Sequence, residues 1–191
     1  MSRITEHKLK DKRFRRTEEA IIVAFFTSTE VLSLERLIRN AGISRATLYR
    51  HHGGIANVVP NYEQYILQKC SHTMQYYMHV KNCGVRSLYH CLLIFLFTHK
   101  KIIQFLYKYG SRDFTTGIVM VLEPKITSTG KVSAGEMFKI YAMEVAVLIE
   151  TWEQGGFDRD DITATLNKIM YLTDTAKERL GPLFDFSSEK A

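Results

Sequence analysis

The stretch LSLERLIRNAGISRATLYRHH, residues 32–52, carries the clearest local structural signals in the chain. Ser33 can cap a helix whose apolar side chains recur at helical spacing. Gly42 should end that helix, because glycine readily adopts the left-handed backbone conformation that a sharp turn demands. Ser44 can cap a second, short helix, and Gly53 follows its expected end. The stretch therefore predicts two short helices joined by a tight turn, which is the helix-turn-helix pattern.

The two faces of the second helix have different expected roles. The small core between the helices should be filled by Leu37, Ala41, Ile43 and Leu48. The outward side chains are expected to be Arg45, Thr47, Tyr49, Arg50 and His51. They combine hydrogen-bond donors with apolar surface, which suits a DNA major groove. The same geometry also occurs as an ordinary corner between helices, so the pattern alone leaves both interpretations open.

Charge is concentrated in the same part of the chain. The 191-residue sequence has a formal net charge of +6, and residues 1–55 hold eleven of its basic residues against six acidic ones. The remaining residues are nearly neutral. A basic head on a neutral body favours a nucleic-acid-binding module attached to a sensing or assembly module, with a solubilising basic tail as the alternative.

The rest of the sequence predicts an all-α protein. Three prolines and few alternating apolar and polar runs argue against strands. We expect helices at residues 16–28, 34–41, 45–51, 57–80, 85–97, 101–109, 114–122, 133–154 and 159–179. The helix at 133–154 has a capping box formed by Ser133 and Glu136.

Residues Arg16 to Val59 resemble the N-terminal domain of the TetR family of bacterial transcriptional regulators. The specific part is AGISRATLY, Ala41 to Tyr49, which matches the family's turn and its Thr-Leu-Tyr tripeptide. Three positions depart from the pattern. Ile38 replaces the usual alanine, His52 replaces the usual phenylalanine, and Ile55 stands where a phosphate-binding lysine is common.

The resemblance implies which residues would contact DNA. Arg45, Ala46, Arg50 and His51 would face the base edges, and Thr47 and Tyr49 would hold phosphates. At the start of the first helix, Arg15, Arg16 and Thr17 would add contacts to the DNA backbone. The capping residues Ser33 and Ser44 complete the set of predicted DNA-binding residues. Phosphate contacts orient such a protein, and base contacts specify the sequence that it reads.

We expect three parts: a basic arm at 1–12, a helix-turn-helix domain at 13–57, and a helical bundle at 58–191 for effector binding and dimerisation. A pocket for a hydrophobic or aromatic effector would be lined by Tyr76, Phe95, Phe105, Tyr109, Phe114, Met120 and Tyr141. A homodimer interface would use Met137, Ile140, Tyr141, Leu148, Trp152, Ile162, Leu166 and Ile169. The resemblance thus implies a ligand-responsive, homodimeric repressor released from a palindromic operator.

Other classes of protein find less support in the sequence. No nucleophile elbow, phosphate loop or HExxH pattern is present, so we expect neither an enzyme nor a cofactor. Three cysteines without a CxxC pair predict reduced thiols and no metal site. The absence of a signal sequence or a long apolar run predicts a cytoplasmic protein that makes no membrane contact. Two alternatives remain, a TetR-like DNA-bound factor controlled by a protein partner and a helical protein-interaction module that binds no DNA.

Overall fold

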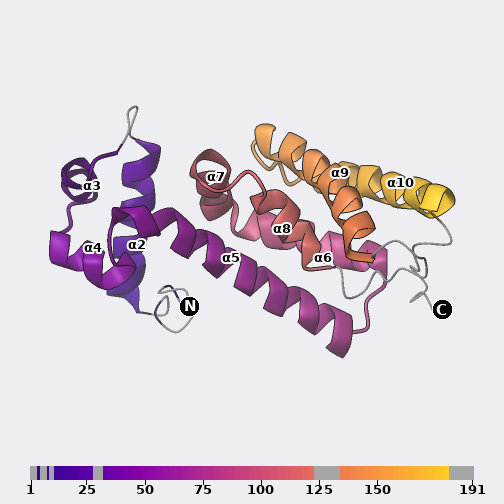
Figure 1. The fold of residues 1–191 in the computed structure, drawn as a ribbon, viewed down its shortest axis with the longest axis horizontal. Helices are drawn as coiled ribbons and strands as arrows, with labels where there is room; N and C mark the ends of the chain where they lie inside the picture. Colours follow the sequence, from indigo (N-terminus) through magenta and orange to yellow (C-terminus); the bar gives the residue numbers. More distant parts are fainter. Residues whose placement is uncertain (1–3, 5–7, 9–10, 28–31, 123–133, 181–191) are drawn as a thin grey trace. The chain divides into compact units, whose positions relative to one another are not determined.

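A computed structural model describes residues 4, 8, 11–27, 32–122 and 134–180 of the chain. The described residues form helices and connecting turns without a β-strand, which confirms the all-α prediction (Figure 1). They divide into two compact units. Unit 1 comprises residues 1–66 and 101–111, and unit 2 comprises residues 67–100 and 112–191.

Unit 1 contains residues 32–52, which form two of its helices and the turn between them. Its helices are α2 (Lys12–Phe26), α3 (Leu34–Ala41), α4 (Arg45–His52), the 3₁₀ turn η1 (Ile55–Asn57), the first half of α5 (Val58–Gln75) and most of α7 (Lys100–Tyr109). Asp11 caps α2, since its side chain accepts a hydrogen bond from the backbone N–H of Arg13 at 2.8 Å. Helix α2 therefore starts one turn earlier than the sequence predicted.

The turn between α3 and α4 follows the sequence signals. Ser33 and Ser44 cap the two helices, accepting hydrogen bonds from the backbone N–H groups of Arg36 and Thr47. Gly42 has φ of 61°, in the left-handed region, and the next residue, Ile43, donates its N–H back to the carbonyl of Ile38 at 3.0 Å. This is the glycine-terminated helix end that a residue with a side chain would strain.

The core of unit 1 includes an aromatic cluster of Phe25, Tyr62, Phe105 and Tyr109. Phe105 packs edge-on against Phe25 at 5.3 Å between ring centroids, and against Tyr62 at 5.4 Å. The Tyr109 hydroxyl donates a hydrogen bond to the carbonyl of Phe25 at 2.6 Å. These contacts fasten α7 to α2 and α5, although α7 follows in sequence only after a helix of the other unit.

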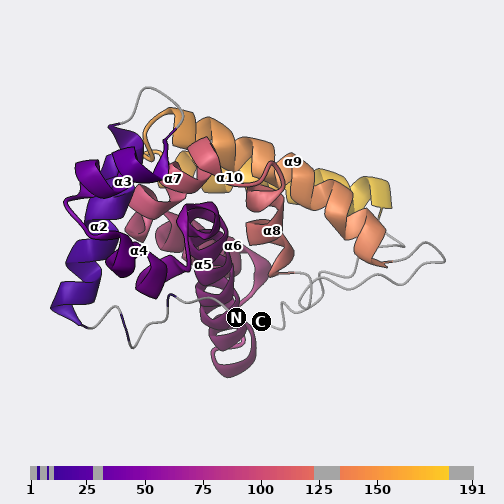
Figure 2. The same cartoon turned by 60° about the vertical axis from the view of Figure 1, so that its left-hand side comes forward.

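Unit 2 is a bundle of helices. It holds the second half of α5, the π-helix η2 (Tyr76–Val80), α6 (Val85–Thr98), α8 (Phe114–Met120), α9 (Ala134–Gln154) and α10 (Ile162–Leu180). Helices α9 and α10 lie side by side in both views (Figures 1 and 2). Between them, the Tyr141 hydroxyl lies 2.6 Å from that of Thr173, which donates to the Ile169 carbonyl. The predicted cap Ser133 lies outside the described residues.

A substitution of Leu48 tests how much the packing of α4 contributes to the stability of unit 1. The Leu48 side chain is fully buried, so Leu48→Ala should lower the free energy of unfolding by about 2–5 kcal/mol through lost burial and the cavity left behind. Urea unfolding followed by circular dichroism measures this. Val23→Ala is the control, because Val23 is 57% exposed on α2 of the same unit. Equal stability of the two variants would show that Leu48 is not a core residue.

Candidate nucleic-acid interface

Helix α4 has one exposed face and one buried face. Arg45, Ala46, Tyr49 and Arg50 are exposed, at positions i, i+1, i+4 and i+5 of the helix. Residues with this spacing lie on adjacent rows of one face. The opposite face holds Leu48, His51 and His52, all buried. The eight-residue helix therefore presents two arginines, one tyrosine and one small residue to the outside.

His51 is the clear exception among the predicted outward residues. Its side chain is 5% exposed, and its ring stacks on Phe14 with 4.2 Å between centroids and 10° between planes. The prediction that His51 faces outward toward base edges is therefore wrong. His51 lies three residues after Leu48, so the helical repeat places it on the face that packs against α2.

A buried carboxylate explains the position of His51. The Glu18 side chain of α2 is 3% exposed, and its Oε1 accepts a hydrogen bond from Nδ1 of His51 at 2.6 Å. Its Oε2 accepts one from Nε2 of His52 at 3.1 Å and another from the Tyr62 hydroxyl. Asn61 completes the group by donating to the His52 carbonyl at 3.2 Å. We call Glu18, His51, His52, Asn61 and Tyr62 the Glu18 cluster.

The protonation of this cluster follows from its contacts. Burial by itself raises the pKa of Glu18, but the hydrogen bond and charge of His52, with the hydrogen bonds from Tyr62 and His51, hold the pKa below its usual value. Burial and the neighbouring Glu18 carboxylate raise the pKa of Tyr62 well above its usual value. Glu18 is thus a carboxylate acceptor, and Tyr62 remains a protonated donor.

The exit from α4 depends on two glycines. Gly53 has φ of 79° and donates its N–H to the Tyr49 carbonyl at 2.8 Å, and Gly54 has φ of 139°. Both lie in the region that residues with a side chain rarely adopt. The pair ends α4 and turns the chain into η1 within two residues.

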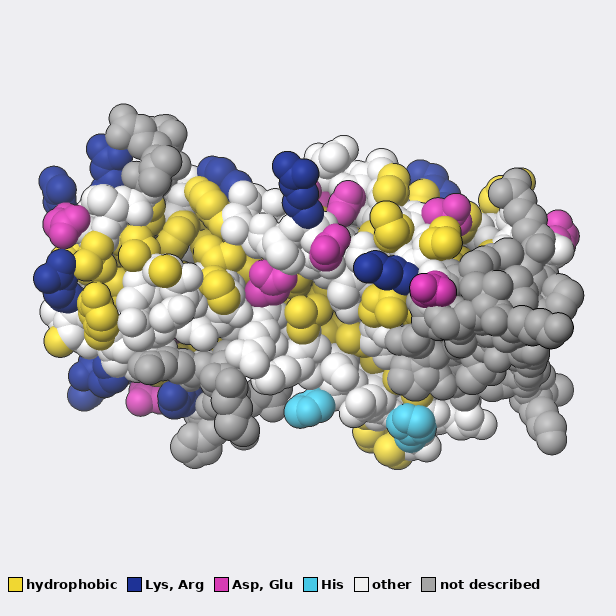
Figure 3. Space-filling model, in the orientation of Figure 1, with side chains coloured by type: hydrophobic (Ala, Val, Ile, Leu, Met, Phe, Trp, Pro, Cys, Tyr) yellow, Lys and Arg dark blue, Asp and Glu magenta, His cyan; other side chains and the backbone are white. Residues whose placement is uncertain are grey.

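The remaining predicted DNA-binding residues lie on α2, on α4 and at the capping positions of α3 and α4. Arg45 pairs with Glu35 of α3 at 3.5 Å, and both side chains are more than 60% exposed. Thr47 is half-buried, with its hydroxyl 2.9 Å from that of the capping residue Ser44. On α2, Arg15 and Arg16 are exposed and Thr17 is half-buried. Figure 3 shows basic side chains over the surface formed by α2, α3 and α4.

The residues predicted to line an effector pocket fall in different units. Phe105 and Tyr109 belong to the aromatic cluster of unit 1, whereas the other five belong to unit 2. Of those five, Phe95, Phe114 and Tyr141 are buried and Tyr76 is 47% exposed. The shared pocket stays a prediction, and Phe105 and Tyr109 have an evident structural role in unit 1.

The predicted dimer interface divides in a similar way. Ile140 is 55% exposed and Leu148 is half-buried, but five others are buried in unit 2 itself: Tyr141, Trp152, Ile162, Leu166 and Ile169. The Met137 side chain lies outside the description. Met143 and Val147 were not among the predicted interface residues, and with Ile140 they form an exposed apolar stripe on α9 at spacing i, i+3 and i+7. The five buried residues therefore belong to a core and not to a free surface.

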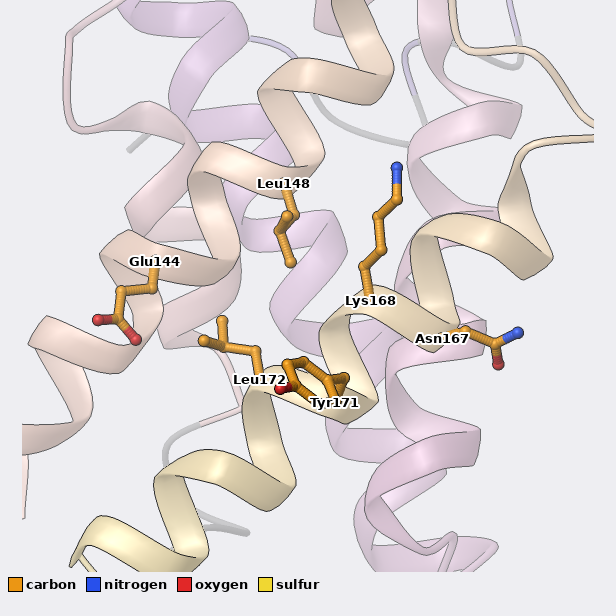
Figure 4. Close-up of a pocket in the computed structure, with 6 residues that line it drawn as sticks. All are labelled: Glu144, Leu148, Asn167, Lys168, Tyr171 and Leu172. Carbon is orange, nitrogen blue, oxygen red and sulfur yellow. The ribbon is translucent and has the colours of Figure 1, made fainter.

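A groove of about 560 Å³ lies between α9 and α10, beside this stripe. Leu148 of α9 and Leu172 of α10 point toward one another across it, and Tyr171 lies at its edge (Figure 4). Glu144 and Lys168 add one acidic and one basic side chain. Hydrophobic side chains lie among acidic and basic ones over these helices in Figure 3.

Comparisons with known proteins add no relative. Searches against protein-family models, curated proteins and solved structures each found no match. Among the described residues, no group of three or more His, Cys, Asp or Glu side chains is arranged to hold a metal ion. None of the described helices has the length and apolar character that crossing a membrane requires.

Tyr62→Phe tests the electrostatics of the Glu18 cluster. Near neutral pH, losing a hydrogen bond to a charged group should cost about 1.5–3 kcal/mol of unfolding free energy. Because the folded-state pKa of Glu18 is lowered, this stabilisation is complete above the usual glutamate pKa and is lost as pH falls through the lowered value. The gap between wild type and variant should therefore shrink below about pH 4.

Urea unfolding at several pH values measures that gap. Tyr109→Phe is the matched control, because its hydroxyl donates to a backbone carbonyl of the same unit. Its cost should not change with pH in this range. A Tyr62→Phe cost that is equally constant would contradict the assignment of Glu18 as a buried carboxylate acceptor.

Proposed function

We propose that this chain is a sequence-specific DNA-binding regulator that uses α4 as its recognition helix. The observation that carries the proposal is the division of α4 into an exposed face with Arg45, Ala46, Tyr49 and Arg50 and a buried, hydrogen-bonded face. A helix held by one side and bearing donors on the other can enter a major groove as a rigid unit. The capped turn before it fits the same role.

The exposed side chains suit specific parts of a duplex. An arginine can donate two hydrogen bonds to O6 and N7 of guanine, the commonest base-specific contact. Ala46 lets the helix backbone approach the bases, and the Tyr49 hydroxyl can donate to a phosphate. At the start of α2, the exposed Arg15 and Arg16 are suited to phosphates on the groove edge.

The ion pair between Arg45 and Glu35 is compatible with DNA contact. Exposed pairs of this kind contribute about 0–1 kcal/mol, so a guanine or a phosphate can replace Glu35 at little cost. In the free protein, the pair places the Arg45 guanidinium beside Glu35 of α3. A pair this exposed does not block the face of α4.

A second copy of the chain would complete the proposed DNA-binding protein. One short helix contacts only a few base pairs, whereas two copies about 34 Å apart can read a palindrome. The α9 stripe of Ile140, Met143 and Val147 supports such a dimer, since exposed apolar patches often mark interfaces. The neighbouring Glu144 and Lys168 supply opposite charges that could pair across such an interface.

The resemblance of Arg16 to Val59 to the TetR family supports a repressor that leaves its operator when a small molecule binds. The effector would be hydrophobic or aromatic and would bind in unit 2, where Phe95, Phe114 and Tyr141 supply an aromatic core. The coupling is reciprocal: an effector that weakens DNA binding must itself bind less well to the DNA-bound protein.

Selection of bound duplexes from a random DNA pool by the full chain tests the proposal directly. Near-physiological salt suppresses non-specific phosphate binding. Enrichment of a palindrome would support a dimeric sequence reader. An unenriched pool would reject it and favour a helical protein-interaction module.

Arg50→Ala should weaken binding to the enriched duplex by about 1–3 kcal/mol and relax the preference at one base position. Fluorescence anisotropy with duplexes varied at each position measures both effects. Arg159→Ala is the control, because it removes the same charge from an exposed position in unit 2. If both variants keep the wild-type sequence profile, Arg50 makes no base contact.

Val147→Glu should break the proposed dimer without unfolding the chain, because Val147 is 60% exposed. Sedimentation velocity should show a monomer, and the affinity for a palindrome should fall by about 100-fold or more as the second half-site is lost. Val80→Glu, at a valine that is 66% exposed on η2, is the control. A Val147→Glu variant with the mass of a dimer would place the interface elsewhere.

A further inference from the structure

The orientation of α4 needs an explanation beyond its own sequence. Helices shorter than about 12–15 residues are marginal on their own in water, and α4 has eight residues. Tertiary contacts must therefore hold it. The buried side chains of α4 are Leu48, His51 and His52, and both histidines form hydrogen bonds with the same Glu18 carboxylate.

These contacts differ in how strictly they fix the helix. Burial of Leu48 is favourable but non-directional, so it tolerates rotation of α4 about its axis. Hydrogen bonds weaken steeply when their angle or length changes. His51 and His52 are consecutive, so their side chains leave the helix about 100° apart and converge on the two oxygens of one carboxylate. A rotation or a slip of α4 breaks at least one of these bonds.

Glu18 is itself held firmly in place. The Tyr62 hydroxyl of α5 donates to the same carboxylate, and Asn61 of α5 donates to the His52 carbonyl. Among the described residues, the only buried acidic or basic side chains are Glu18, His51 and His52, and the carboxylate contacts both histidines. Leaving that carboxylate without donors would be costly, so the three helices hold one mutual arrangement.

We propose that Glu18 is the positioning residue of α4, fixing the rotation that turns Arg45, Ala46, Tyr49 and Arg50 outward and thereby setting the DNA selectivity of the chain. The consequence for selectivity rests on the proposed DNA-binding function. The local effect on α4 does not, because it concerns contacts within unit 1 alone.

Native-state hydrogen exchange on the full chain tests the local effect. Glu18→Gln removes the charge that three donors share, and the amides at the end of α4 should exchange about ten- to a hundredfold faster than in wild type. Amides of α9 in unit 2 should be unchanged. Glu19→Gln is the matched control, since Glu19 is the next residue of α2 and its side chain is 67% exposed.

His51→Phe gives a second, independent variant. Phenylalanine keeps the ring that stacks on Phe14 and keeps the burial, but cannot donate to Glu18. It should also speed exchange at the end of α4, and it decides the question if Glu18→Gln does not fold. Wild-type exchange in α4 of the folded variants, or an equal effect of Glu19→Gln, would overturn the proposal.

DNA selectivity is then measured on the folded variants. The ratio of affinities for the enriched duplex and for an unrelated duplex of equal length should fall about tenfold or more in Glu18→Gln and His51→Phe. A purely structural role would lower stability and leave that ratio unchanged, which would overturn the link to selectivity. If wild type enriches no duplex, the proposed function fails, while hydrogen exchange still decides whether Glu18 positions α4.

Discussion

A carboxylate removed from water has to recover its lost hydration from protein donors, and in unit 1 this requirement applies to Glu18. The donors come from two other helices, His51 and His52 of α4 and Tyr62 of α5. None of the three helices can shift alone without leaving a buried charge under-satisfied. The exposed face of α4, and every role proposed for it, depends on this one group of hydrogen bonds.

The elements that the sequence predicted well are those fixed by local backbone chemistry. Helix α3 spans Leu34–Ala41 as expected, because a capping serine starts it and a left-handed glycine ends it within the same ten residues. Helix α4 begins after Ser44 for the same reason. The start of α2 was missed because Asp11 lies within a basic run that looked like an arm, although its side chain caps the helix.

The Glu18 cluster was missed, although the sequence carries its signal. Glu18 lies on the apolar stripe of α2 with Ile21, Ile22 and Phe25, at spacing i, i+3, i+4 and i+7. A carboxylate on a buried stripe requires buried donors, and His51 follows Leu48 by three residues on α4. Which donors meet Glu18 could not be predicted, because the contact joins residues more than thirty positions apart.

Long-range packing also decides how the α9 surface should be interpreted. This helix is apolar on two sides, with Tyr141, Val145 and Ile149 in the core of unit 2 and the stripe at Ile140, Met143 and Val147 exposed. Periodicity reports both sides as one broad apolar face, so it cannot tell a core from an interface. The folded chain separates them, because the core needs only one side.

The proposed function gives a physical reason for the exposure of the α9 stripe. An α4 face of four residues is too small to select one site among many, and a second copy joined through α9 would double the sequence read. Each copy would bring its own Glu18 cluster, so the two recognition helices would be fixed rigidly within their units. A change in the spacing between copies would then move whole recognition helices, which is how an effector could release a palindrome without altering α4.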